Sequence, residues 1–138
     1  MTFRVELIVT LAPALADALR AAASAAYPDE CCGLLEGVRD GDVFHVQALH
    51  PARNLAARSD RFEIDPADHI AAQKAARAHG RAIIGCYHSH PDGAAQPSQT
   101  DAAGASQNDF LWLIVAGEEV GCFVYRDGGF RGCVTGAV

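Results

Sequence analysis

The sequence predicts an α/β fold: a single-domain α-β-α sandwich in which a central mixed, mostly antiparallel sheet lies between helices. Short apolar segments rich in strand-forming residues alternate with longer segments whose apolar residues recur at helical spacing. Asp-Gly and Gly-Gly turns separate neighbouring strand-like segments, which is typical of antiparallel hairpins. The chain has 138 residues, of which 50% are hydrophobic, so we expect one domain over residues 1–138 with a sizeable core.

The N-terminal part begins with a strand followed by a helix. Phe3–Val9 alternates apolar and polar residues as a strand does, and Leu11–Ala26 combines many alanines with apolar residues at helical spacing. Cys31–Val38 and Val43–Leu49 are both strand-like and are separated by a turn that contains Asp40-Gly41. We therefore expect them to form a hairpin.

A polar segment follows the hairpin and leads to a second helix. Pro51–Arg61 lacks periodicity and predicts a surface loop, and Phe62–Ile64 predicts a short strand. Asp65 is suited to cap a helix whose first position is Pro66, and Gly80 ends that helix.

The C-terminal part is mainly strands. A short helix interrupts them after a loop, and a Gly-rich turn at 127–129 separates the last two strands. The expected elements are a strand at Arg81–Tyr87, a helix from Gln99 to about Ser106, and strands at Phe110–Ala116, Val120–Arg126 and Phe130–Val134.

The charge distribution excludes two classes of partner. The net charge is −6 and the one lysine is Lys74, so the chain offers no basic surface for nucleic acid or for an anionic membrane. The N-terminal residues lack a basic segment followed by an apolar one, and no apolar run approaches the roughly 18 residues of a membrane span. We expect a cytoplasmic protein, and abundant alanine with arginine in excess over lysine fits a bacterial source.

The cysteines do not form a metal-binding or disulfide pattern. There are five of them, with no C-x-x-C pair, and four lie in apolar strand-like segments. We expect reduced thiols in the core. Cys31 is the exception, because it neighbours an acidic residue, Glu30, that enters the argument below.

The segment from residue 88 to residue 101 carries the most specific pattern. His88 and His90 follow the strand-like Arg81–Tyr87, and after seven further residues come Ser98 and Asp101. Two residues apart on a strand, the imidazoles point to the same side. Ser98 has the form of a helix N-cap with Asp101 one turn in. Two imidazoles and one carboxylate are the ligand set of a catalytic zinc site with one open position.

That pattern has a simpler interpretation as well. His88 and His90 can be ordinary, partly buried histidines, with Ser98 and Asp101 a plain capping pair. The combination arises by chance on the order of once in a thousand sequences of this composition. Two other zinc schemes fit less well, because the chain has neither an H-E-x-x-H motif nor the P-C-x-x-C of the nucleoside deaminases.

A second segment, Tyr27–Gly37, places a glutamate ahead of a Gly-Leu-Leu-x-Gly strand. Together the two segments resemble the JAMM (MPN+) zinc metalloprotease family, in particular its short stand-alone bacterial members. Asn54 and the segment from Arg61 to Pro66 share in the resemblance, which covers most of residues 20–115. The signature positions are filled by Glu30, His88, His90, Ser98 and Asp101.

The resemblance implies a cytidine-deaminase-like fold, one Zn²⁺ per chain held by His88, His90 and Asp101, and catalytic roles for Glu30 and Ser98. Zinc makes hydroxide available near neutral pH, but a base must take the proton and an acid must protonate the departing amine. Glu30 can serve as both base and acid. Without the rest of the motif, its position in the sequence is also typical of a solvated acid in a loop. Ser98 can donate to an oxyanion. The same ligands accept other divalent first-row metals.

For substrate, the resemblance implies a peptide or isopeptide bond at the C-terminal tail of a ubiquitin-like or sulfur-carrier protein. An extended tail is suited to strand addition at a sheet edge beside the metal. The segment from Asp101 to Phe110 is too short for the insertions with which eukaryotic deubiquitinases hold ubiquitin. For Asn54 we expect a loop-holding role.

Two other functions remain open at this point. A cell-wall or phage-tail peptide hydrolase would share the motif. A non-catalytic MPN scaffold or zinc-binding module would need neither Glu30 nor Ser98, and the chain has both.

Overall fold

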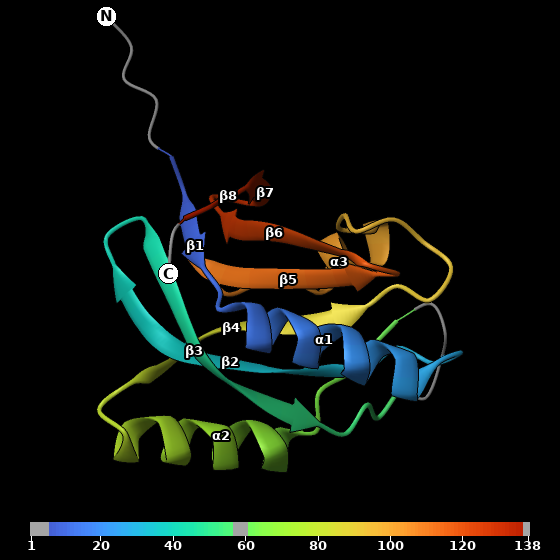
Figure 1. The fold of residues 1–138 in the computed structure, drawn as a ribbon, viewed down its shortest axis with the longest axis horizontal. Helices are drawn as coiled ribbons and strands as arrows, with labels where there is room; N and C mark the ends of the chain where they lie inside the picture. The colour runs from blue at the N-terminus through green and yellow to red at the C-terminus, as the bar shows by residue number, and fades with distance from the viewer. Residues whose placement is uncertain (1–5, 57–60, 137–138) are drawn as a thin grey trace, which may run out of the picture.

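The structure, a computed structural model, describes residues 6–56 and 61–136 (Figure 1). The strands are β1 (Ile8–Thr10), β2 (Cys32–Asp40), β3 (Val43–Ala52), β4 (Ala82–Ser89), β5 (Phe110–Ala116), β6 (Glu119–Arg126), β7 (Gly129–Gly132) and β8 (Val134–Thr135). The helices are α1 (Pro13–Ala26), α2 (Pro66–Ala78) and α3 (Gln99–Gly104).

The described strands form one mixed sheet in the order β7-β6-β5-β4-β2-β3-β1-β8. β4 runs parallel to β5, and β1 runs parallel to both β3 and β8. The other neighbours are antiparallel. The prediction of a mixed, mostly antiparallel sheet with helices against it is therefore confirmed. β4 lies at the centre of this sheet, between β2 and β5.

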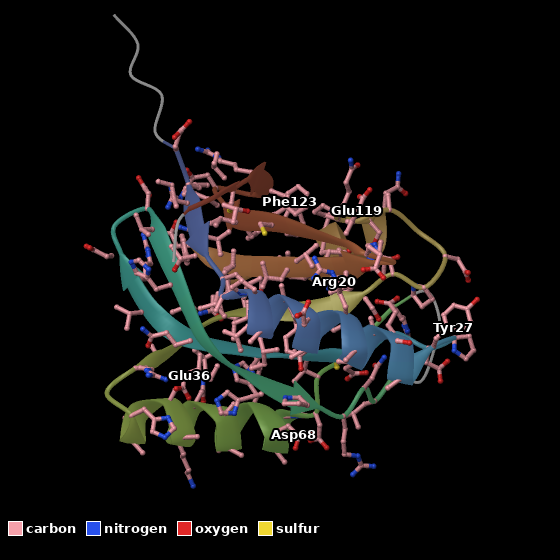
Figure 2. The ribbon with its side chains drawn as sticks, in the orientation of Figure 1. Arg20, Tyr27, Glu36, Asp68, Glu119 and Phe123 are labelled. Carbon is pink, nitrogen blue, oxygen red and sulfur yellow. The ribbon has the colours of Figure 1, made fainter. Side chains whose placement is uncertain are left out.

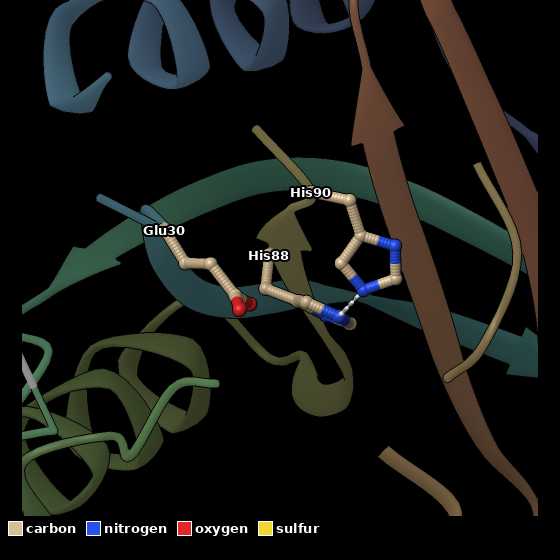
Figure 3. A group of neighbouring side chains, drawn as sticks. All are labelled: Glu30, His88 and His90. Carbon is tan, nitrogen blue, oxygen red and sulfur yellow. Dashed lines mark hydrogen bonds between the residues drawn. The ribbon is translucent and has the colours of Figure 1, made fainter. Parts of the chain in front are cut away.

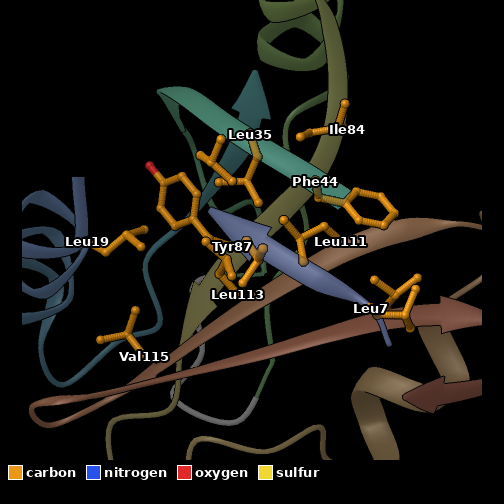
Figure 4. Packing of buried hydrophobic residues seen from close by; sticks show 12 residues of the cluster. Leu7, Leu19, Leu35, Phe44, Ile84, Tyr87, Leu111, Leu113 and Val115 are labelled. Carbon is orange, nitrogen blue, oxygen red and sulfur yellow. The ribbon is translucent and has the colours of Figure 1, made fainter. Parts of the chain in front are cut away.

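Strand alternation divides the core into two hydrophobic clusters, one on each face of the sheet. The first cluster contains Leu35 and Tyr87 and is covered by Leu19 of α1 (Figure 4). The second cluster contains the adjacent residues Leu34 and Cys86 and includes Ala72 of α2. Successive strand residues point to opposite faces, so each strand supplies both clusters. We refer to these two sides as the α1 face and the α2 face.

The two ends of the sheet meet at Cys133. The Cys133 N–H donates to the carbonyl of Cys122 in β6, whereas the next N–H, that of Val134, donates to the carbonyl of Leu7 beside β1. β7 therefore pairs with β6 while β8, two residues later, pairs with β1. The sheet consequently curls around the α1-face cluster.

This pairing corrects the prediction of one strand at Phe130–Val134. The segment is divided at Cys133, because its halves bond to strands at opposite ends of the sheet. The predicted short strand at Phe62–Ile64 is also wrong: the structure has an isolated antiparallel bridge between Asn54 and Ile64.

Other boundaries differ by a few residues. β3 extends to Ala52, beyond the predicted end at Leu49, and α3 ends at Gly104. α1 begins at Pro13. The capped start of α2 agrees with prediction, since the Asp65 side chain accepts from the N–H of Ala67. Residues 3–5 of the predicted first strand and 57–60 of the predicted loop lie outside the described residues.

None of the helices in residues 6–56 and 61–136 is long and apolar enough to cross a membrane.

A buried carboxylate joins β2 to the end of α2. Glu36 is fully buried on the α2 face, where β2 has a bulge (Figure 2). Its oxygens lie 2.9 Å from His50 Nε2, 3.0 Å from His79 Nδ1 and 2.9 Å from Arg81 Nη1. Burial alone would raise the pKa of Glu36, but the hydrogen bonds from His50, Arg81 and His79 outweigh it and lower the pKa to about 2.

This depressed pKa predicts a specific loss of stability in acid. An acid whose pKa is lower in the folded state stabilises the fold above its unfolded pKa, and that stabilisation is lost as the pH falls through the two values. From about pH 5 to about pH 3, the free energy of unfolding should fall by about 2 kcal/mol more in the wild type than in Glu36→Gln, which cannot ionise. Urea unfolding at both pH values measures this difference, and equal losses in the two proteins would contradict it.

Candidate metal centre

The end of β4 presents both histidines on the α2 face. His88 and His90 follow Cys86 at intervals of two residues, so they share the face of Cys86. His88 is fully buried. Its ring stacks on Phe62 with centroids 4.2 Å apart and meets Trp112 edge-on at 5.6 Å. In the described part of the chain, His88 Nδ1 has no hydrogen-bond partner. Aromatic packing therefore holds this ring.

The start of α3 positions the carboxylate. Ser98 is the N-cap, and its Oγ accepts from the Asp101 N–H at 3.0 Å. In return, Asp101 Oδ2 accepts from the Ser98 N–H at 2.9 Å. This reciprocal capping box ties the carboxylate to the backbone on one side. Asp101 is buried, with 4% of its surface exposed.

The three predicted ligand atoms meet in a triangle. His88 Nε2 and His90 Nε2 are 3.0 Å apart, and each lies 3.1 Å from Asp101 Oδ2. Ligands of a tetrahedral zinc ion with bonds of about 2.0–2.1 Å lie about 3.3 Å from one another. The triangle therefore needs an expansion of only a few tenths of an ångström to hold such an ion.

The tautomer of His90 also fits a cation. His90 Nδ1 donates to the carbonyl of Ala94 at 2.8 Å, which leaves a lone pair on Nε2 of the neutral ring. That lone pair faces an oxygen of Asp101. Two electron-rich atoms at this separation repel each other unless a proton or a metal ion lies between them. The donor set thus suits a divalent cation.

The ionisation equilibria around the triangle favour the ligand forms of two side chains, the neutral imidazole of His88 and the carboxylate of Asp101. Burial lowers the pKa of His88, against a smaller opposing effect of Asp101. The hydrogen bond to Asp101 raises the pKa of His90 and so favours its protonated ring, and a cation bound at the triangle would have to displace that proton. For Asp101, burial would raise the pKa, but the hydrogen bonds to the two imidazoles hold it well below its usual range. The carboxylate is therefore ionised throughout the neutral range, as a metal ligand must be.

Glu30 lies beside the triangle. It directly precedes β2, and only 3% of its surface is exposed, so it is not a solvated loop acid. One carboxylate oxygen and a nitrogen from each of His88 and His90 lie within 4.8 Å of one another (Figure 3). Glu30, His90 and Ser98 line a cavity of about 460 Å³. A substrate in this cavity would meet all three side chains.

The Asn54 side chain fastens a loop to the backbone of Glu30. Its Nδ2 donates to the Glu30 carbonyl at 3.0 Å, and its Oδ1 accepts from the N–H groups of Ala56 and Glu63 at 3.0 and 2.9 Å. These bonds agree with the expected loop-holding role. The loop also carries Phe62, so a single segment contacts both Glu30 and His88.

All five cysteines lie in the described residues as free thiols; Cys32 and Cys86 are buried in the core as predicted, whereas the other three are only half-buried. Cys31 packs against the α1-face cluster, away from the imidazoles. Burial is the main cause that raises its pKa, which keeps the thiol protonated at neutral pH. Its N–H donates to Ser89 Oγ at 2.9 Å. Cys31 therefore contributes packing and a backbone contact beside the candidate site.

The aromatic support of His88 has no counterpart in the sequence pattern. Phe62 and Trp112 lie 24 or more residues from His88 along the chain, in segments that the sequence predicts as strands, and no local pattern links them to the imidazole. The sequence likewise assigns no role to Ser89, although its place between the two histidines and its polarity in an apolar strand are visible signals.

Fold and site together define a class of protein: an α/β protein with a curled mixed sheet and a candidate His-His-Asp metal centre where its central strand ends. The family model for prokaryotic homologs of the JAB domain matches residues 12–126. The chain belongs to this prokaryotic JAB family, which is part of the JAMM/MPN group.

Three curated relatives are informative. A desampylase of Haloferax volcanii is 39% identical over 88 residues, which is 63% of this chain and 62% of the relative. The tail tip assembly protein K of Escherichia phage N15 is 35% identical over 104 residues, 75% of this chain and 39% of the relative. The CysO-cysteine peptidase of Mycobacterium tuberculosis is 28% identical over 102 residues, 74% of this chain and 68% of the relative. The match thus spans less than two thirds of the first two relatives.

Solved structures share the fold. The solution structure of a Desulfitobacterium hafniense protein superposes with a TM-score of 0.82 at 31% identity, covering 93% of this chain and 92% of that one. A structure described as JAMM, a metalloprotease-like zinc site in the proteasome and signalosome, has a TM-score of 0.52 at 19% identity over 96% of this chain and 100% of that one. The second likeness concerns the fold alone.

The Asn54 contacts predict a loss of stability on truncation. Asn54→Ala removes the side chain that holds the loop to Glu30, so the free energy of unfolding should fall by about 1–3 kcal/mol while bound zinc is retained. Asn108→Ala is the matched control, because Asn108 makes one exposed bond, to the Asp127 N–H. Urea unfolding and elemental analysis measure the two quantities. If the free energy of unfolding falls by the same small amount in both variants, Asn54 does not hold the loop to Glu30.

Proposed function

We propose that this chain is a zinc-dependent metallopeptidase, a single domain over residues 1–138, that hydrolyses a peptide or isopeptide bond. The observation that carries the proposal is the triangle of His88, His90 and Asp101 with Glu30 beside it. Ser98 and Glu30 open onto the same cavity. A scaffold or storage role would require neither of these two side chains.

His88, His90 and Asp101 would hold the zinc, and Glu30 and Ser98 would carry out proton transfer and stabilise charge. When bound, zinc supplies a water of lowered pKa and polarises the scissile carbonyl. The Glu30 carboxylate takes a proton from the attacking water and delivers it to the leaving nitrogen. Its burial restricts bulk water from competing for that proton.

Ser98 is suited to stabilise a developing oxyanion. Its Oγ already accepts from the Asp101 N–H, so its own O–H remains free to donate. The hydroxyl is held in place by the start of α3, and it lines the cavity that Glu30 borders. A donor that is positioned before the reaction begins need not reorganise during it.

The proposed substrate is the C-terminal tail of a ubiquitin-like or sulfur-carrier protein. The similarity to a desampylase and to a CysO-cysteine peptidase supports this choice over free peptides. The proposed location is the cytoplasm, since all five cysteines are free and two of them, Cys32 and Cys86, lie in the core, as expected for a reducing compartment.

A second candidate function is the hydrolysis of cell-wall or phage-tail peptides. The observation in its favour is the similarity to a phage tail tip assembly protein. The two candidates share the chemistry and differ in substrate, so substrate cleavage decides between them.

Replacement of the proposed proton carrier tests the chemistry. Glu30→Gln keeps the shape of the side chain but cannot accept a proton, so it should bind about one zinc per chain and lose about 10²–10⁴-fold in turnover. The assay is mass spectrometry of a ubiquitin-like sulfur carrier extended by one or more residues. Asp29→Asn, a change at the exposed neighbouring acid, is the matched control and should cleave normally. Full activity in Glu30→Gln would exclude the assigned role.

Replacement of the carboxylate ligand tests the metal. Asp101→Ala should lose both zinc and activity, because two imidazoles alone hold the ion weakly. Asp92→Ala removes an exposed acid from the same loop and should retain about one zinc per chain. Elemental analysis after dialysis compares the two variants, with thermal unfolding to confirm that both are folded. Stoichiometric zinc in Asp101→Ala would show that another residue is the third ligand.

A further inference from the structure

A second cavity, of about 280 Å³, lies on the α2 face beyond Asp101. Its floor consists of buried apolar side chains from three strands: Leu34 of β2, Cys86 of β4 and Trp112 of β5. Phe62 forms part of its wall. The functional assignment above uses none of this space. Its volume lies just under the range of about 300–1,000 Å³ that is typical of small-molecule sites, and it suits a single large side chain.

The chemistry of the cavity changes from floor to rim. Trp112, Leu34 and Cys86 are 7%, 1% and 4% exposed and present carbon and sulfur. Thr100 and Gln107 are exposed and border the opening with polar groups. A dry apolar floor beneath a polar rim favours an apolar side chain carried on a polypeptide, whose backbone polar groups stay at the rim.

The cavity is continuous with the candidate metal centre. Asp101 lines it while its Oδ2 belongs to the ligand triangle. Phe62 and Trp112, which line it from two sides, also contact the His88 ring at 4.2 and 5.6 Å. An extended chain advances about 3.3 Å per residue, so a chain positioned at the metal reaches this opening within a few residues.

We propose that this cavity binds a leucine-sized or larger apolar side chain of the substrate polypeptide, a few residues from the scissile bond. The proposal rests on the peptidase function above and defines its substrate further: a chain with one apolar anchor near the cleaved bond. Burial of one such side chain should raise kcat/KM about 10–100-fold over a chain without it.

The chain provides a direct reporter of binding. Trp112 is its one tryptophan and lies in the floor of the cavity, so its fluorescence should respond when the cavity fills. Glu30→Gln loaded with zinc permits this titration without turnover. The probes are synthetic decapeptides made of serine with a Gly-Gly-Ala cleavage segment. Each of four peptides carries a single leucine, placed at a different one of the four positions before that segment. The parent peptide has no leucine.

A blocking variant tests the location. Gly104 of α3 lines the cavity, its φ lies outside the left-handed region, and a Cβ added there meets nothing within 4 Å. Gly104→Leu should therefore fit the fold, and because Gly104 borders the cavity, the added side chain is expected to compete for the space. Ala103→Leu adds the same side chain at the preceding, exposed position of α3, outside the cavity lining, and is the matched control. Zinc content and thermal unfolding are measured for both.

The expected result is that leucine at one position raises kcat/KM about 10–100-fold and gives a saturable change in Trp112 emission. Gly104→Leu should abolish both effects and Ala103→Leu should preserve them. If peptides are cleaved without any preference for leucine, or if Gly104→Leu leaves the leucine effect intact, the cavity is not this subsite and the peptidase function stands. If no peptide is cleaved, the peptidase function is in question, and the fluorescence titrations with the two variants still decide the cavity.

Discussion

The hydrogen bond from the Ser98 N–H to Asp101 Oδ2 is the constraint on which the candidate site depends. A carboxylate near two imidazoles is free to rotate away unless something holds it. Here the helix cap holds it, so the oxygen that ends the capping box is also one corner of the ligand triangle. Because α3 is only a short helix, its start and the candidate metal centre form a single structural unit.

The sheet explains why that unit meets its partners. β4 lies at the centre of the order and ends where α3 begins across a loop, so His88 and His90 project toward the cap. The loop that follows β3 then covers the same face, with Asn54 bonded to the Glu30 carbonyl and Phe62 against His88. The candidate ligands, the proposed proton carrier and the apolar cavity therefore share one layer, and a change in that loop should affect all three.

The buried carboxylate of Glu36 provides a contrast within the same face. It is also surrounded by two histidines, but Arg81 neutralises it, and its partners approach different oxygens. Its lowered pKa reflects a satisfied ion network that joins β2 to the end of α2. At Asp101 no arginine or lysine side chain forms an ion pair in the described residues, and the imidazole nitrogens converge on one oxygen. Glu36, which is paired with a permanently charged arginine, is therefore a structural acid, whereas Asp101, which lacks such a partner among the described residues, is a candidate ligand.

The sequence by itself determined the helices, most strands, the two-residue spacing of the histidines and the capping pair, because each depends on neighbours a few positions apart. Tertiary structure decided the rest. Whether Phe130–Val134 is one strand depends on which strands are near Cys133, and whether Phe62 supports a ligand depends on where its loop crosses the sheet. Such contacts join residues far apart in the chain, and local periodicity carries no information about them. The burial of Glu30, which turns a loop acid into a candidate catalyst, likewise exists only once the chain is folded.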